Sequence, residues 1–153
     1  MDTGLTNREE YVLTNGNHPG AVEKGFEWLQ EEWQDPENRD TVIAVPSKGN
    51  LDNIRDSLKS LLGESGFKDL KSSDNYTNLG EGVHLHTMTK RIRPNRWDGG
   101  PVLALFVDDE QLEEIDELRG TTSILAVPWR REDVSDWEDR WSPEVVQFDP
   151  NEN

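Results

Sequence analysis

The sequence predicts an α/β fold, specifically a three-layer α/β/α sandwich of Rossmann-like type with a mostly parallel sheet and one antiparallel strand. Short apolar runs alternate with longer segments of helical periodicity along the 153 residues, which is typical of βαβ units. Residues 41–45 and 123–127 are apolar without polar alternation, as expected of strands covered on both faces. We expect a single domain over 1–153, with 1–8 and 149–153 frayed.

The first apolar run, 11–13, leads into a turn and a helix. Residues 14–20 contain two glycines and a proline, which favour a turn, and Asn17 or His18 is expected to cap the helix that follows. The helix repeats its apolar residues at steps of three and four. Pro36 predicts its end, because the residue before a proline is driven out of helical geometry.

Strand 41–45 precedes a second helix. Its apolar stripe runs over 51–62, and Gly63 and Gly66 are expected to end it. Residues 71–82 are rich in Ser, Asn and Gly and predict a surface loop.

Residues 83–88 alternate between polar and apolar and predict a strand with one wetter face. The loop 91–100 is too short to hold a crossover helix, so strand 101–107 is expected to be an antiparallel neighbour of the preceding strand. Asp108 or Asp109 is expected to cap the next helix.

The C-terminal part predicts one more strand and helix. Strand 123–127 is followed by a short helix with Val134, Trp137 and Trp141 on one face. Residues 145–148 are expected to add an edge strand.

The composition restricts the classes of partner. The chain has 32 Asp and Glu against 16 Lys and Arg, a formal net charge of -16, and this field repels phosphate backbones and anionic lipids. Duplex DNA and membrane surfaces are therefore disfavoured, whereas a small anionic ligand or a protein partner stays open. The acidic residues are spread along the whole chain, which suits a cytoplasm of molar salt, where the Debye length is about 3 Å. We expect a halophilic, cytoplasmic protein.

The sequence also argues against cysteine chemistry, and we expect neither an export signal nor a membrane span. The chain has no cysteine, so thiol nucleophiles and zinc–thiolate sites are absent. The first residues lack the basic and apolar regions of a signal peptide. The apolar run 101–107 is far shorter than the ~20 residues that span a bilayer.

Polar side chains follow several of the predicted parallel strands, and ligands of open α/β sheets bind at the carboxyl ends of such strands. Two of the loops also lead into helix N-termini, which favour anions. We therefore expect an anion site at this edge of the sheet. Its ligand-binding candidates are Asn15, Asn17, Ser47, Lys48, Asn50 and Arg130, and its acid–base candidates are His18 and Asp108.

Two further features, a pair of histidines and a basic loop, indicate sites away from this edge of the sheet. His84 and His86 share one face of a strand about 6.6 Å apart, a spacing that a metal could bridge. No third ligand lies at a fixed spacing, so we predict no metal site there and expect solvated imidazoles. No cofactor is indicated by any motif.

A basic loop, residues 90–97, holds a quarter of the Lys and Arg residues. Arg and Trp together suit phosphate contact and base stacking, as in readers of single-stranded nucleic acid. The alternative is that the loop braces neighbouring elements through ion pairs, and this is the favoured interpretation. The candidate residues are Arg91, Arg93, Arg96 and Trp97.

Three hypotheses of function follow. The first is a small α/β domain that binds a phosphate-bearing metabolite or nucleotide at the carboxyl ends of the parallel strands, with hydrolase or transferase activity as an open question. The second is a non-catalytic protein-interaction module of a halophile, docking through exposed Trp129, Trp137 and Trp141. The third is contact with single-stranded nucleic acid through residues 90–97.

The net charge predicts that salt stabilises the fold. Raising KCl from about 0.1 M to about 2 M shortens the Debye length from ~10 Å to ~2 Å and so screens the self-repulsion of the charge. The melting temperature, followed by circular dichroism, should rise over this range. A flat or falling melting temperature would contradict the halophilic interpretation.

Overall fold

The computed structural model describes residues 9–15, 18–94, 97, 99–118 and 120–148. The strands are β1 (Glu9–Leu13), β2 (Asp40–Ala44), β3 (Tyr76–Gly80), β4 (Val83–Met88), β5 (Gly100–Leu105), β6 (Thr121–Val127) and β7 (Glu144–Val146). The helices are α1 (Pro19–Glu32), α2 (Gly49–Asn53), α3 (Arg55–Lys71), α4 (Asp109–Asp116) and α5 (Ser135–Trp141), with short 3-10 helices η1 (Pro36–Asn38) and η2 (Arg131–Val134).

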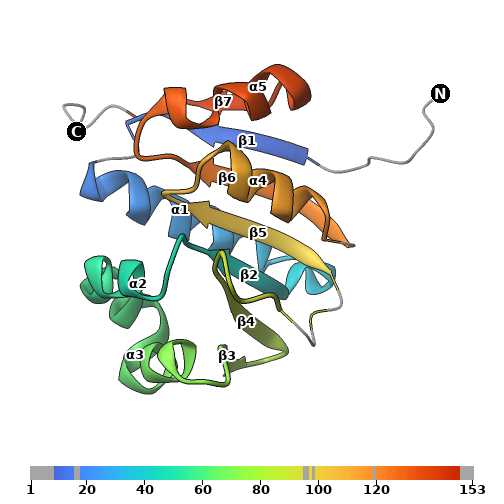
Figure 1. Cartoon of the computed structure of the whole chain (residues 1–153). Coiled ribbons are helices and arrows are strands. Elements are labelled where there is room, and N and C mark those ends of the chain that lie inside the picture. The colour runs from blue at the N-terminus through green and yellow to red at the C-terminus, as the bar shows by residue number, and fades with distance from the viewer. Residues whose placement is uncertain (1–8, 16–17, 95–96, 98, 119, 149–153) are drawn as a thin grey trace.

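The strands form one seven-stranded sheet in the order β3-β4-β2-β5-β6-β1-β7 (Figure 1). All neighbouring strands run parallel except the pair of β3 and β4. The predicted three-layer α/β sandwich with a mostly parallel sheet and one antiparallel strand is therefore confirmed.

Each face of the sheet carries its own hydrophobic cluster. One cluster buries apolar residues of α1, α2 and α3, such as Phe26, Leu51 and Leu58. The other buries residues of α4, η2 and α5, such as Leu112 and Trp137. In Figure 1, α4 and α5 lie over the β5–β6–β1 part of the sheet, while β2, β4 and β3 form its opposite end.

Helix capping follows the sequence signals closely. His18 caps α1, with its Nδ1 accepting a hydrogen bond from the N–H of Gly20 at 3.0 Å. Asp108 caps α4 by accepting from the N–H of Gln111 at 2.9 Å. The helix over 51–62 is interrupted at Gly63 as expected, because Gly63 takes a non-helical backbone with a φ of 79°. A second helical segment follows directly and continues to Lys71, so the expected end at Gly66 is wrong.

The antiparallel strand is not the one that the sequence indicated. The predicted surface loop 71–82 contains β3, which forms a hairpin with β4. β4 itself is parallel to β2, and β2 is parallel to β5. The prediction that the strand over 83–88 is an antiparallel neighbour of strand 101–107 is therefore wrong.

The error has a simple physical cause. The segment between β4 and β5 crosses β2 as an irregular loop, without the helix that usually makes a parallel connection. It starts at the carboxyl end of β4, where Lys90 lies 3.5 Å from Asp108, and ends at the amino end of β5. An irregular loop of this length can therefore connect two parallel strands without a helix.

The far end of this crossover is fixed to the start of β2. The indole Nε1 of Trp97 donates to the carbonyl oxygen of Asp40 at 2.8 Å, and the ring packs against the cluster beneath α4 and α5. Gly100 follows with a φ of 152°, and a Cβ at this position would collide with the same carbonyl oxygen. Only glycine therefore lets β5 begin this close to β2.

None of the helices in the described ranges is both long and apolar enough to cross a membrane.

Gly100→Ala should test this close approach. The added methyl group must displace the backbone of Asp40 and also strains φ, which together cost about 2 kcal/mol or more of unfolding free energy. Urea denaturation at fixed salt measures the loss. Gly49→Ala is the matched control, because a Cβ there lies 3.7 Å from its nearest neighbour, and it should stay within about 0.5 kcal/mol of the wild type. Equal stability of the two variants would contradict the close approach.

The partly buried carboxylate of Glu32 is an electrostatic cost to the fold. Glu32 ends α1 and accepts a hydrogen bond from the hydroxyl of Ser123 on β6 at 3.0 Å. Burial raises the pKa of Glu32, and the nearby carboxylates of Glu9 and Asp35 raise it further, whereas the hydrogen bond from Ser123 opposes the shift. The folded protein therefore holds the Glu32 proton more tightly than the unfolded chain does.

This sign predicts how Glu32→Gln behaves with pH. Ionised Glu32 destabilises the fold, and this cost grows as pH rises from the unfolded to the folded pKa and is full above both. Glu32→Gln should therefore raise the melting temperature more at pH 7 than at about pH 4. Glu27, which is exposed on the same helix, gives the control Glu27→Gln, which removes the same charge. If both variants gained equally at pH 7, burial of Glu32 would not be the cause.

Candidate functional site

A cavity of about 760 Å³ at the β3–β4 end of the sheet brings together two histidines, a tyrosine and an aspartate. It lies between the sheet and the crossover loop, and we call it the loop-side cavity. No helix takes part in its lining, because α4 and α5 pack over other strands. Its lining residues are Asp40, Ser73, Asp74, Asn75, Tyr76, His84, His86, Arg91, Ile92, Arg93 and Pro94.

The floor of the cavity is set by strand alternation. Asp40 opposes His84 across the β2–β4 pairing, and Tyr76 opposes His86 across the β3–β4 pairing. Residues at every second position of a strand share one face, so these four side chains emerge on the same side of the sheet. Three strands thus bring two imidazoles, a phenol and a carboxylate together.

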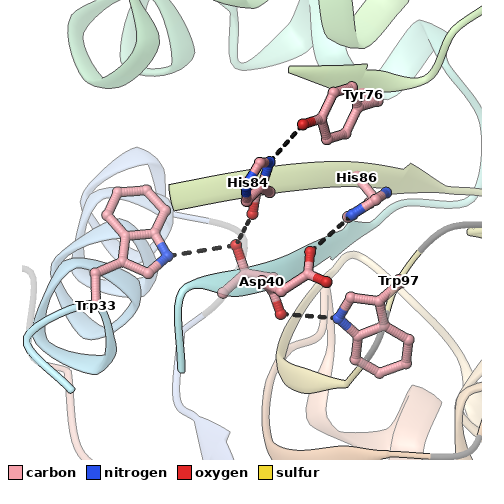
Figure 2. Close-up of polar contacts among 7 residues, drawn as sticks. Trp33, Asp40, Tyr76, His84, His86 and Trp97 are labelled. Atoms are coloured by element: carbon pink, nitrogen blue, oxygen red, sulfur yellow. Dashed lines mark hydrogen bonds and ion pairs between the residues drawn. The ribbon is translucent and has the colours of Figure 1, made fainter. Parts of the chain in front are cut away.

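His86 is the most buried of these groups, with 5% of its surface exposed. Its Nε2 lies 2.8 Å from Oδ1 of Asp40 (Figure 2). A carboxylate at this position accepts the Nε2 proton, so Nδ1 is the acceptor nitrogen whenever the imidazole is neutral. Asp40 is held in turn, because its carbonyl oxygen accepts from Trp97.

His84 has an equivalent partner on the other side. Its Nδ1 is hydrogen bonded to the hydroxyl of Tyr76, and the two rings stack with centroids 5.6 Å apart (Figure 2). Tyr76 also contacts His86, with ring centroids 5.0 Å apart. The carbonyl oxygen of His84 accepts from Thr41, whose hydroxyl accepts from the indole of Trp33 at 3.3 Å. Backbone and ring of His84 are therefore both held.

Two arginines of the basic loop border the cavity. The guanidinium of Arg93 already has partners within the protein. Its Nη2 lies 3.5 Å from Oε2 of Glu114 on α4, and its Nη1 donates to the carbonyl of Thr89 at 3.4 Å. The guanidinium of Arg91 is exposed and makes no hydrogen bond or ion pair with any other residue that the structure describes. Arg91 thus brings an uncompensated cation to a cavity with two imidazoles.

The cavity wall also holds an unsatisfied acceptor. Asn75 has a positive φ of 53°, and its Nδ2 donates to the carbonyl of Ser73 at 3.2 Å. Its Oδ1 is buried without a hydrogen-bond partner within the described part of the chain. An unpaired buried acceptor of this kind is costly to the fold.

A shared metal between the two histidines receives no support from the geometry. Within the residues described, no group of three or more His, Asp or Glu side chains is arranged to hold a metal ion. The expectation of solvated imidazoles is wrong for His86, which the crossover loop and Tyr76 enclose.

The carboxyl edge of the sheet carries the site residues that the sequence singled out, because β1, β2, β5 and β6 are parallel and end there. Lys48 donates its ammonium to the carbonyls of Lys71 and Ser72 at the end of α3. Arg130 pairs with Asp133 at 3.2 Å.

The other candidates at this edge also have local partners. Ser47 donates to the side chain of Asn50. Asn15 donates to the carbonyl of Phe148 at 2.7 Å. His18 and Asp108 serve as the helix caps described above, and Asn17 lies outside the described residues. These contacts account for each described side chain without a ligand.

The residues of the basic loop do not all fit one interpretation, since some act as a brace and one is open to a ligand. Arg93 behaves as a brace, and Trp97 is partly buried and hydrogen bonded, whereas Arg91 is open. Arg96 lies outside the described residues. The loop borders the His84–His86 face of the sheet.

The tryptophans proposed as a docking surface are only partly exposed. Trp129 is 54% exposed and contacts the edge of Phe106. Trp137 is buried in the core at 2%, and Trp141 is partly buried with its indole donating to Asp116. The expectation that Trp137 is exposed is therefore wrong.

Sequence reasoning missed Asp40, Tyr76, His84 and His86 as one site. The His-x-His spacing on an otherwise apolar strand was a usable signal. Asp40 precedes an apolar run and could be placed beside it only with the β2–β4 register. Tyr76 lay in a segment interpreted as a loop, so no signal linked it to the histidines.

The chain matches no known family model, and no curated protein or solved structure is significantly similar to it.

Proposed function

We propose that this protein binds a small phosphate-bearing anion in the loop-side cavity. The observation that carries the proposal is the exposed and unpaired Arg91 at the mouth of a cavity floored by His84 and His86. Exposed cations without a partner also occur elsewhere among the described residues, for example Lys24, Lys68 and Arg140, but Arg91 is the one of these that lines a cavity with two imidazoles. Guanidinium groups bind phosphate through two parallel hydrogen bonds.

The size and polarity of the cavity support a small ligand. A volume of about 760 Å³ lies within the range of metabolite and nucleotide sites. The lining contains two carboxylates, which repel a bound anion to different degrees. Asp40 is hydrogen bonded to His86, whereas Asp74 is exposed at the edge of the cavity. The protein's acidic surface disfavours a long polyanion, so the ligand class is a single phosphate group on a small molecule.

The carboxyl edge is the alternative location for the same ligand class. Lys48 is its strongest cation, but the ammonium is already bound by two backbone carbonyls, at 3.1 and 2.6 Å. A ligand would have to displace these contacts, whereas Arg91 has none to lose. This difference favours the loop-side cavity.

Arg91→Ala should weaken binding of inorganic phosphate and of AMP by about 1–3 kcal/mol, a 5- to 150-fold rise in Kd, because a charge-assisted hydrogen-bonding group is lost. Isothermal titration calorimetry at constant salt measures it.

The matched control is Arg140→Ala, which removes the same charge from an exposed position on α5 and should leave Kd unchanged. Lys48→Ala should lower stability through the end of α3 but leave Kd unchanged. Weaker binding in Lys48→Ala, with normal binding in Arg91→Ala, would move the site to the carboxyl edge.

A further inference from the structure

We propose that the loop-side cavity cleaves a small ribose phosphodiester, with His86 as the proton acceptor and His84 as the proton donor. The inference rests on the proposed phosphate site and adds a reaction to it. Neither histidine was among the residues expected to carry chemistry. The observation behind it is that each imidazole is held at one nitrogen by a group from a different strand.

The two imidazoles are placed as a pair. They lie at alternate positions of β4, on one face, with backbones about 6.6 Å apart. His86 is held through Nε2 and His84 through Nδ1, so Nδ1 of His86 and Nε2 of His84 remain. Neither remaining nitrogen makes a hydrogen bond with another residue in the described ranges. A phosphate group bound between the two imidazoles would have His84 next to one of its oxygens and His86 next to another.

The unequal partners assign the roles. Asp40 accepts the Nε2 proton of His86, which leaves a lone pair on Nδ1 and stabilises the imidazolium formed when His86 takes up a proton. The hydroxyl of Tyr76 can accept a hydrogen bond from Nδ1 of His84 when this imidazole is protonated. His86 is thus prepared to accept a proton and His84 to give one. Asp40 and Tyr76 are positioning residues.

The reaction balances without a further reactant. The ribose 2′-hydroxyl gives its proton to Nδ1 of His86, and its oxygen forms a bond to phosphorus. The bond from phosphorus to the 5′-oxygen breaks, and this oxygen receives the proton from Nε2 of His84. The products are a 2′,3′-cyclic phosphate and a free 5′-hydroxyl. Proton exchange with water then restores both imidazoles.

The remaining groups of the cavity fit this substrate. Arg91 and Arg93 border it where negative charge grows on the phosphoryl oxygens. A hydroxyl fixed next to phosphorus has a high effective concentration, so no separate nucleophile has to be bound. The charged and titratable groups facing the two imidazoles are Asp40, Asp74, Tyr76, Arg91 and Arg93.

The test uses the ribodinucleotides UpA, ApC, CpG and GpU and their 2′-deoxy counterparts, with products separated by chromatography. At least one ribodinucleotide should yield the cyclic phosphate, and no deoxy counterpart should react. The dependence of kcat on pH should be bell-shaped. Cleavage of the deoxy compounds, or a hydrolytic product without a cyclic phosphate, would overturn the assigned nucleophile.

The variants separate the two roles. His86→Ala and His84→Ala should each lower kcat by about 10²- to 10⁴-fold. His86→Ala should lose the acidic limb of the pH profile and His84→Ala the alkaline limb, and added imidazole should partly restore His86→Ala. His86→Gln can still donate to Asp40, so it tests the same role if the Ala variant fails to fold. Asn78→Ala, on β3 outside the cavity, is the control and should retain full activity.

Binding distinguishes failure of the reaction from failure of the site. If inorganic phosphate binds and Arg91→Ala weakens it while every dinucleotide stays intact, the reaction is wrong and the binding site stands. If neither phosphate binding nor cleavage is seen, both proposals are wrong. If cleavage persists unchanged in both histidine variants, His84 and His86 do not carry it.

Discussion

The structure depends on the way the chain returns from β4 to β5. A parallel connection over β2 is made here by an irregular loop rather than by a helix, and its far end is fixed by the hydrogen bond from Trp97 to the carbonyl of Asp40. Because no helix covers this end of the sheet face, the side chains of three strands line an open cavity there. The same loop carries the arginines to the cavity, so topology and candidate site have one origin.

Electrostatics explains why a cationic loop can exist on so acidic a chain. Arg93 and Lys90 contact Glu114 and Asp108, which tie the loop to α4, and exposed pairs of this kind contribute little stability. Arg91 contributes nothing to such a brace. Because exposed pairs add so little, folding does not require Arg91 to be paired, and its guanidinium stays available at the lining of the loop-side cavity.

The residues at the carboxyl edge show why a general rule of α/β folds can place candidates correctly and still not identify a site. Lys48, Asp108 and His18 lie at the expected edge, yet each satisfies a helix end. The unpaired backbone groups at helix termini attract the same polar side chains as an anion does. Only the partners of a side chain distinguish the two uses, and partners are not visible in a single sequence.

Local patterns in the sequence determined the fold class and the two fully covered strands, because these depend on neighbours close along the chain. The same patterns limited the helix caps to Asn17 or His18 and to Asp108 or Asp109, and the structure selected His18 and Asp108. The tertiary structure alone decided the direction of β4, the strand at 76–80 and the meeting of Asp40, Tyr76, His84 and His86. The physical reason is that pairing register joins residues far apart in sequence. A loop of this length permits both a return and a crossover, and the packing of Trp97 against Asp40 and the core fixes the crossover.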